Sequence, residues 1–167
     1  YVAGLLLTPV VLGFYNLIAD LISRFLFIPG TICGVLFPEV SKNKALIPVV
    51  YKKALFILMP LLLFIFLGVN IFGRDLLIWW LNRELPKTVD NYILIMSIGL
   101  VFISLSQIWF SIIQGSGFVK FTAKFNFIQL IIFLPLLYLL TNFYGVKGLL
   151  LGWILRCMID SLVLYIY

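Results

Sequence analysis

Long apolar runs separated by short polar stretches make up almost the whole chain. A helix needs about 20 mostly apolar residues to cross the hydrocarbon core of a bilayer. The segments that meet this requirement are residues 14–37, 54–73, 92–115, 122–142 and 148–167. The pattern therefore predicts five membrane-spanning helices.

The first residues are harder to assign, because residues 1–7 are apolar but too short to span a membrane. Thr8-Pro9, followed by Gly13, predicts a break in the helix. We therefore expect residues 1–7 to be the end of a truncated helix, with a tight turn before Phe14. The alternative is a single span through residues 1–19. The chain begins and ends inside apolar stretches, so we expect it to be part of a longer membrane protein.

Composition supports a membrane protein. The 167 residues are 64% hydrophobic and 11% charged, with a mean hydropathy of +1.21. Soluble domains are about 45–50% apolar and about 25% charged, and disordered chains combine low hydrophobicity with high charge. The expected fold is all-α: a polytopic transmembrane helix bundle of five full spans plus one truncated helix, forming a single lobe over residues 1–167.

Several kinds of chemistry are excluded by residues that the chain lacks. It contains no histidine, which excludes catalysis or metal binding by that residue. Cys33 and Cys157 lie far apart in apolar runs, so we expect buried small side chains and not a redox or metal site. The two acidic residues within spans each have an arginine one turn away. We expect no catalytic residues, no metal and no cofactor, and the chain is not predicted to be an enzyme.

The net charge of +6 comes mainly from residues between the apolar runs. Such loop cations set membrane orientation, so we do not expect nucleic-acid binding. Alternate connections, at residues 38–53 and 115–124 on one side and 74–90 and 141–147 on the other, carry six and four basic residues. The side with six is predicted to be cytoplasmic, and Trp79 and Trp80 are predicted to lie near the outer interface.

Polar residues within spans are costly and usually face protein or water. Asn16, Asp20 and Arg24 follow one another at steps of four, which places them on one face of a helix. Two interpretations are open. The Asp20–Arg24 pair can neutralise itself and fix helix packing, or the stripe can line an aqueous cavity and contact a charged substrate.

The last predicted helix repeats this spacing with Gly148, Gly152, Arg156 and Asp160. The two glycines are typical of close helix packing. The Arg156–Asp160 pair needs a protein or water environment inside the membrane, which favours a charged central cavity.

A third polar face runs along residues 92–115 without any charge. Its members are Ser97, Ser104, Gln107, Ser111 and Gln114. They can form hydrogen bonds between helices, or provide a wall for sugar hydroxyl groups. Residues 54–73 contain only Asn70 as a polar side chain of this kind, and we expect this segment to face lipid.

Several short motifs resemble the polysaccharide biosynthesis (O-antigen, Wzx-type) flippase family. Gly13, Tyr15 and Ala19 open a helix that closes on Leu36-Phe37-Pro38-Glu39-Val40-Ser41. A later small-residue turn, Gln114-Gly115-Ser116-Gly117, leads to Lys120, and Tyr144-Gly145-Val146-Lys147-Gly148 follows. The resemblance places the chain in the carboxyl-terminal lobe of a twelve-helix exporter, of which it is half.

The resemblance implies a transporter that works by alternating access. Its cargo is a polyprenyl-diphosphate-linked oligosaccharide, moved from the inner to the outer leaflet of the bacterial cytoplasmic membrane, where Arg24 and Arg156 meet the diphosphate. The implied partners are this lipid-linked oligosaccharide, membrane lipids and the amino-terminal lobe of the same protein. Two alternatives remain: a multidrug or cation antiporter of the same superfamily, with Asp20 or Asp160 as the cation site, and a membrane polysaccharide polymerase or ligase.

Overall fold

The computed structural model describes residues 9–166, without the side chains of Val10 and Val11. This part of the chain is helical and contains no strand. Five of its helices are long and apolar enough to cross a membrane, which confirms the predicted fold class. They are α2 (Pro9–Lys42), α3 (Ile47–Leu81), α4 (Thr88–Gly115), α5 (Val119–Tyr144) and α6 (Val146–Ile166), and the short 3-10 helix η1 (Lys44–Leu46) joins α2 to α3.

Helix α2 begins earlier than the sequence predicted. The described residues are helical from Pro9 and continue without interruption through Gly13, so the predicted tight turn before Phe14 is wrong. A glycine inside a helix costs only about 1 kcal/mol relative to alanine, which a long packed helix tolerates. Residues 1–7, predicted to end a truncated helix, lie outside the described residues.

The connections are shorter than the charge pattern suggested. The charged residues Arg74 and Asp75 lie within α3, which runs for 35 residues. At a rise of 1.5 Å per residue this helix is about 52 Å long, against about 30 Å for the hydrocarbon core. Its ends therefore extend beyond the apolar layer, where charged side chains reach water while the backbone remains hydrogen-bonded. The segments left between helices are Asn43, residues 82–87, residues 116–118 and Gly145.

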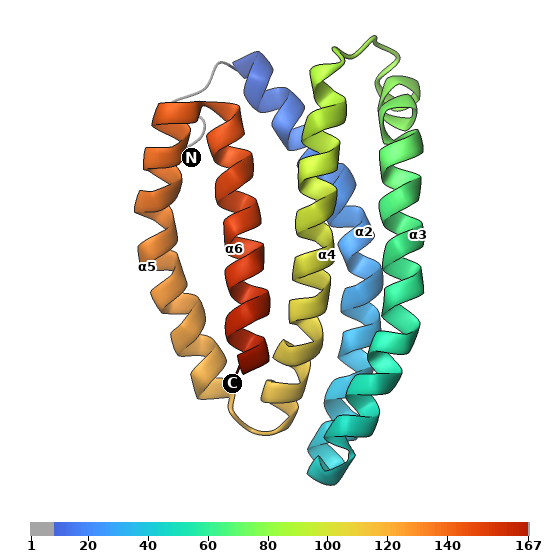
Figure 1. The fold of residues 1–167 in the computed structure, drawn as a ribbon, viewed down its shortest axis with the longest axis vertical. Coiled ribbons are helices and arrows are strands. Elements are labelled where there is room, and N and C mark those ends of the chain that lie inside the picture. Colours follow the sequence, from blue (N-terminus) through green and yellow to red (C-terminus); the bar gives the residue numbers. More distant parts are fainter. Residues whose placement is uncertain (1–8, 167) are drawn as a thin grey trace.

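Helix α4 is the centre of the bundle and packs against α2, α3 and α6, while α5 packs mainly against α6 (Figure 1). A stripe of α3 is buried in this arrangement and includes Leu58 and Leu62. Phe56 and Phe64 project from the opposite face and are 84% and 77% exposed. The expectation that residues 54–73 face lipid therefore applies only to the outer face of α3.

Glycines allow the helices to approach one another closely. A side chain at Gly148 would collide with the backbone carbonyl of Leu140, and one at Gly152 would lie 2.9 Å from the side chain of Leu137. This confirms that Gly148 and Gly152 serve close packing, here between α6 and α5. Helix α4 meets α6 in the same way, because the indole ring of Trp153 occupies the space beside Gly99.

The two cysteines are buried and free, as the sequence predicted. Cys33 is 2% exposed and Cys157 is 1% exposed. Both act as small apolar side chains in the helix contacts.

The ends of the bundle differ in charge. The ammonium group of Lys44 lies 5.9 Å from the centre of the Phe118 ring, which places η1 and the α4–α5 connection at the same end. The α3–α4 connection and the α5–α6 turn lie at the opposite end, together with the start of α2 (Figure 1). The alternation of connections on which the charge count rested is therefore confirmed. That the lysine-rich end is cytoplasmic stays a prediction.

Candidate functional site

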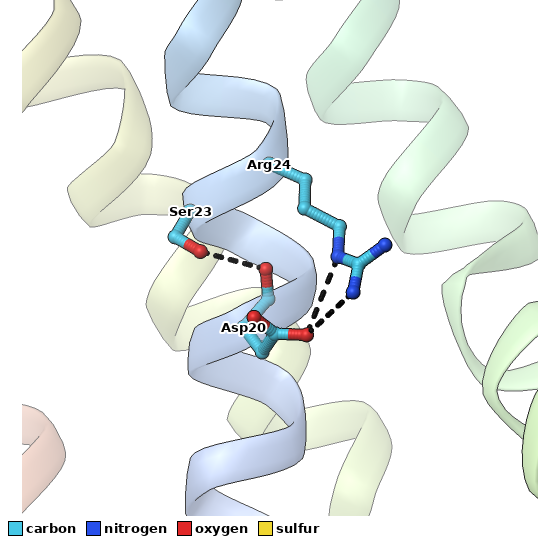
Figure 2. Close-up of polar contacts among 3 residues, drawn as sticks. All are labelled: Asp20, Ser23 and Arg24. Atoms are coloured by element: carbon cyan, nitrogen blue, oxygen red, sulfur yellow. Dashed lines mark hydrogen bonds and ion pairs between the residues drawn. The ribbon is translucent and has the colours of Figure 1, made fainter.

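An exposed ion pair marks one face of α2. The Nη2 atom of Arg24 lies 3.1 Å from Oδ2 of Asp20, and Nε donates to the same oxygen at 3.3 Å (Figure 2). The two side chains are 65% and 50% exposed. Asn16, one turn earlier on the same face, is also exposed. The polar stripe predicted on this helix is therefore exposed in this part of the chain.

Arg24 also contacts α3. Its guanidinium carbon lies 5.0 Å from the ring centre of Trp80, close enough for a cation–π interaction. Figure 2 shows the side chain extending from α2 towards α3. Trp80 belongs to the last turn of α3, so the ion pair lies towards the end of the bundle that carries the α3–α4 connection.

A second polar cluster joins α5 and α6. The Nε atom of Arg156 is 4.0 Å from Oδ2 of Asp160, and the amide of Gln129 on α5 donates a hydrogen bond to Oδ1 of that carboxylate. The guanidinium group also lies 5.5 Å from the ring centre of Phe133. Arg156 stands midway between the ends of α6, about 15 Å from each at the helical rise. This cluster therefore lies near the middle of its helix.

Sequence reasoning missed Gln129. The signal was present, because an amide inside a long apolar run must find a partner or water. What the sequence could not show is that this partner lies on the following helix.

The polar face of α4 divides into two parts. Ser97 and Ser104 are fully buried, and their hydroxyl groups donate to carbonyls of their own helix. Ser97 also accepts a hydrogen bond of 2.9 Å from the amide of Asn70 on α3, which supports the helix-packing interpretation at that position. Ser104 bonds to Leu100 and lies inside the α4 packing.

The other part opens onto a pocket. Gln107, Ser111 and Gln114 line a pocket of about 450 Å³ between α2 and α4. The Oε1 atom of Gln107 is buried and has no hydrogen-bond partner among the described residues. Three of the predicted polar residues on this helix therefore line that pocket, and Gln114 also donates a hydrogen bond of 3.5 Å to the hydroxyl of Thr122 on α5.

The two arginines contact different helices. Arg24 lies over an aromatic ring of α3, and Arg156 lies over one of α5. Their placement in a single cavity therefore stays a prediction. Each guanidinium group has five N–H donors, and one carboxylate partner does not use them all. Both retain donors for a second anion, such as a phosphate.

No other ligand chemistry is indicated in the part of the chain that the structure describes. No group of three or more Cys, Asp or Glu side chains there is placed to hold a metal ion. Asp20 and Asp160 each have an arginine partner. The arrangement offers guanidinium, amide and hydroxyl groups for hydrogen bonding.

Comparison with known proteins gives a protein of similar sequence. The chain is 31% identical over 155 residues to a Shigella flexneri protein named "Putative O-antigen transporter". The match covers 91% of this chain and 37% of the relative, so the chain spans little more than a third of that protein's length. The chain is related to that protein over this part of its length. The resemblance seen in its motifs is thereby confirmed, and the helices identify it as a multi-pass membrane protein.

Two further comparisons found nothing. No protein-family model matches the chain, and no solved structure matches it significantly.

Proposed function

We propose that this chain is part of a transporter that moves a polyprenyl-diphosphate-linked oligosaccharide from the inner to the outer leaflet of the bacterial cytoplasmic membrane by alternating access. The observation that carries the proposal is the Asp20–Arg24 pair, because at least half of each side chain is exposed on a helix long enough to span the membrane. Charged side chains within a spanning helix are costly in contact with lipid and usually face protein or water. This face is therefore expected to border water or the rest of the transporter.

The chemistry of the proposed cargo matches the residues available. A diphosphate is a dense anion, and arginine binds phosphate through paired N–H donors. The partner carboxylate orients each guanidinium group and limits its net charge. Binding that is moderated in this way suits a transporter, which must release its cargo on the other side of the membrane.

The decisive experiment measures surface glycan in a strain that lacks its own transporter and expresses the full-length protein. Arg24→Ala and Arg156→Ala are expected to reduce export about tenfold or more at normal protein level, because each removes charge-assisted hydrogen bonds. Lys53→Ala, which changes an exposed basic residue of α3, serves as the control and should export normally. If both arginine variants restore full export, these residues do not bind the cargo and the proposal fails.

A conservative substitution separates charge from geometry. Arg24→Lys keeps the positive charge but loses the fork of donors. It is expected to export more than Arg24→Ala and less than the wild type. Equal export by the lysine and alanine variants would contradict a role in binding the anion.

The same strain distinguishes the alternative functions. A cation antiporter would give proton- or sodium-dependent drug efflux and no glycan defect on deletion. A polysaccharide polymerase or ligase would give loss of chain extension while lipid-linked units still reach the outer leaflet. The arginine partners of both intramembrane carboxylates argue against a cation site on Asp20 or Asp160.

A further inference from the structure

Helices α2 and α4 approach closely at Gly115 and leave a pocket between them further along. At the contact, a side chain on Gly115 would lie 3.0 Å from the carbonyl oxygen of Phe37, and the hydroxyl of Ser41 donates to the carbonyl of Gly115 at 3.2 Å. Further along α2 towards its start, Gly30 and Gly34 present no side chain to the space between the helices. The pocket of about 450 Å³ opens there.

The lining of this pocket is mostly apolar, with a few polar groups and no charged side chain. Two amides and a hydroxyl group, from Gln107, Gln114 and Ser111, are combined with the phenyl rings of Phe37 and Phe110. Ligand pockets typically have mostly apolar walls with a few well-placed polar groups, and volumes of about 300–1,000 Å³. Because no charged side chain lines it, the pocket suits a neutral ligand better than a diphosphate.

One lining atom lacks a partner. The Oε1 atom of Gln107 is buried without a hydrogen bond from any described residue, and a side chain on Gly30 would lie 3.5 Å from it. Leaving a buried acceptor unpaired is costly, so such groups in native proteins normally have a protein or water partner. Oε1 has almost no accessible surface in this conformation, so a ligand hydroxyl group would donate to it once the Gln107 side chain turns towards the pocket.

We propose that this pocket binds a sugar ring of the transported oligosaccharide, with Gln107 as hydrogen-bond acceptor and the two phenyl rings against the apolar face of the sugar. The inference rests on the proposed function and adds a separate subsite for the neutral part of the cargo. The pocket lies near the end of the bundle that carries Lys44 and Phe118, since Gln114 belongs to the last turn of α4. If that end is cytoplasmic, as the charge count predicts, the subsite lies on the side where the cargo is loaded.

The first test fills the pocket in the full-length transporter. Gly34→Leu places a side chain in space that is empty in the structure, and Gly68→Leu on α3 is the matched control, since a Cβ atom at either position meets no atom within 4 Å. Both changes replace glycine by a better helix former, so both variants are expected to fold. Gly34→Leu should reduce glycan export about tenfold or more through loss of ligand hydrogen bonds, whereas Gly68→Leu should not.

The outcomes separate this inference from the proposed function. If Arg24→Ala abolishes export and Gly34→Leu exports as well as Gly68→Leu, the subsite is wrong and the proposed function stands. If neither Arg24→Ala nor Gly34→Leu affects export, both are overturned.

A second variant tests Gln107 itself. Gln107→Leu keeps a similar volume and removes the unpaired acceptor, so the thermal stability of the purified transporter should not fall. Export should nevertheless fall about tenfold, because the sugar loses its acceptor. A loss of stability with unchanged export per molecule would instead assign Gln107 to helix packing and overturn the subsite.

A labelling experiment covers the case in which Gly34→Leu does not accumulate. Gly34→Cys, combined with Cys33→Ala and Cys157→Ala, is treated with a membrane-impermeant methanethiosulfonate in the purified transporter. Lipid-linked oligosaccharide extracted from the same strain should slow the labelling, while polyprenyl phosphate without sugar should not. Equal labelling rates with both probes would overturn the subsite.

Discussion

The side-chain amide of Gln129 on α5 donates a hydrogen bond to the carboxylate of Asp160 on α6. Arg156 lies on the other side of that carboxylate and over the ring of Phe133 on α5. Helix α5 packs mainly against α6, and few of its residues are buried. The polar cluster is therefore a principal contact that holds α5 to the bundle.

Removing this amide should loosen α5. Gln129→Leu leaves Asp160 with Arg156 alone, and we expect it to destabilise the protein by about 1–2 kcal/mol, the range of interhelical hydrogen bonds in model membrane peptides. The measurement is unfolding in detergent mixtures with increasing sodium dodecyl sulfate. Asn126→Leu, at an exposed position one turn away on α5, is the control and should unfold as the wild type does.

The contact between Gly99 and Trp153 sets the distance between α4 and α6. Gly99→Ala places a methyl group within the volume of the indole ring, and overpacking of this kind costs about 1–3 kcal/mol. Trp153→Leu in the Gly99→Ala background should recover part of that stability. Gly68→Ala, where a methyl group meets no atom within 4 Å, should cause no loss. Equal stability of the two alanine variants would contradict the contact.

The hydrogen bond between Asn70 and Ser97 should be measurable as a coupling between α3 and α4. In a double-mutant cycle of Asn70→Leu and Ser97→Ala, the coupling energy should be about 0.6 kcal/mol, the average for such bonds in a membrane protein. The same cycle with Ser104→Ala should give additive effects, because the Ser104 hydroxyl bonds only to its own helix. Additivity in both cycles would show that the bond contributes nothing.

The orientation in the membrane can be tested at the two ends of the bundle, of which the lysine-rich end is predicted to be cytoplasmic. In a variant with Cys33→Ala and Cys157→Ala, Arg83→Cys should react with an impermeant maleimide in intact cells. Lys120→Cys, at the lysine-rich end, should react only after the membrane is permeabilised. Both positions are exposed, so accessibility is decided by the side of the membrane. The reverse labelling pattern would contradict the positive-inside assignment.

The five spans could be predicted because a helix in a bilayer must hide its backbone polar groups and present about 20 apolar residues. The start of α2 could not be predicted in this way. Pro9 and Gly13 indicate a break in the helix, but this tendency is weak in a long helix that packs against α4. The lengths of the connections also escaped prediction. Charged residues such as Arg74 end an apolar run without ending a helix.

The contacts of the polar residues could also be predicted only in part. The pairs Asp20–Arg24 and Arg156–Asp160 were predictable because residues four apart share a helix face. Spacing alone did not reveal that Arg24 lies over Trp80, or that Gln129 completes the cluster of Arg156 and Asp160. It also placed Ser104 and Gln107 on one face, although the structure buries the first and directs the second to a pocket.

By itself, the sequence therefore determined that this is a membrane protein, how many spans it has and which ion pairs form within a helix. These features depend on composition and on contacts within one helix. Only the tertiary structure decided which helices meet, where glycines permit close contact and which polar groups remain open. Those features depend on how neighbouring helices cross, and residues such as Gln129 and Asp160 meet there although they are far apart along the chain.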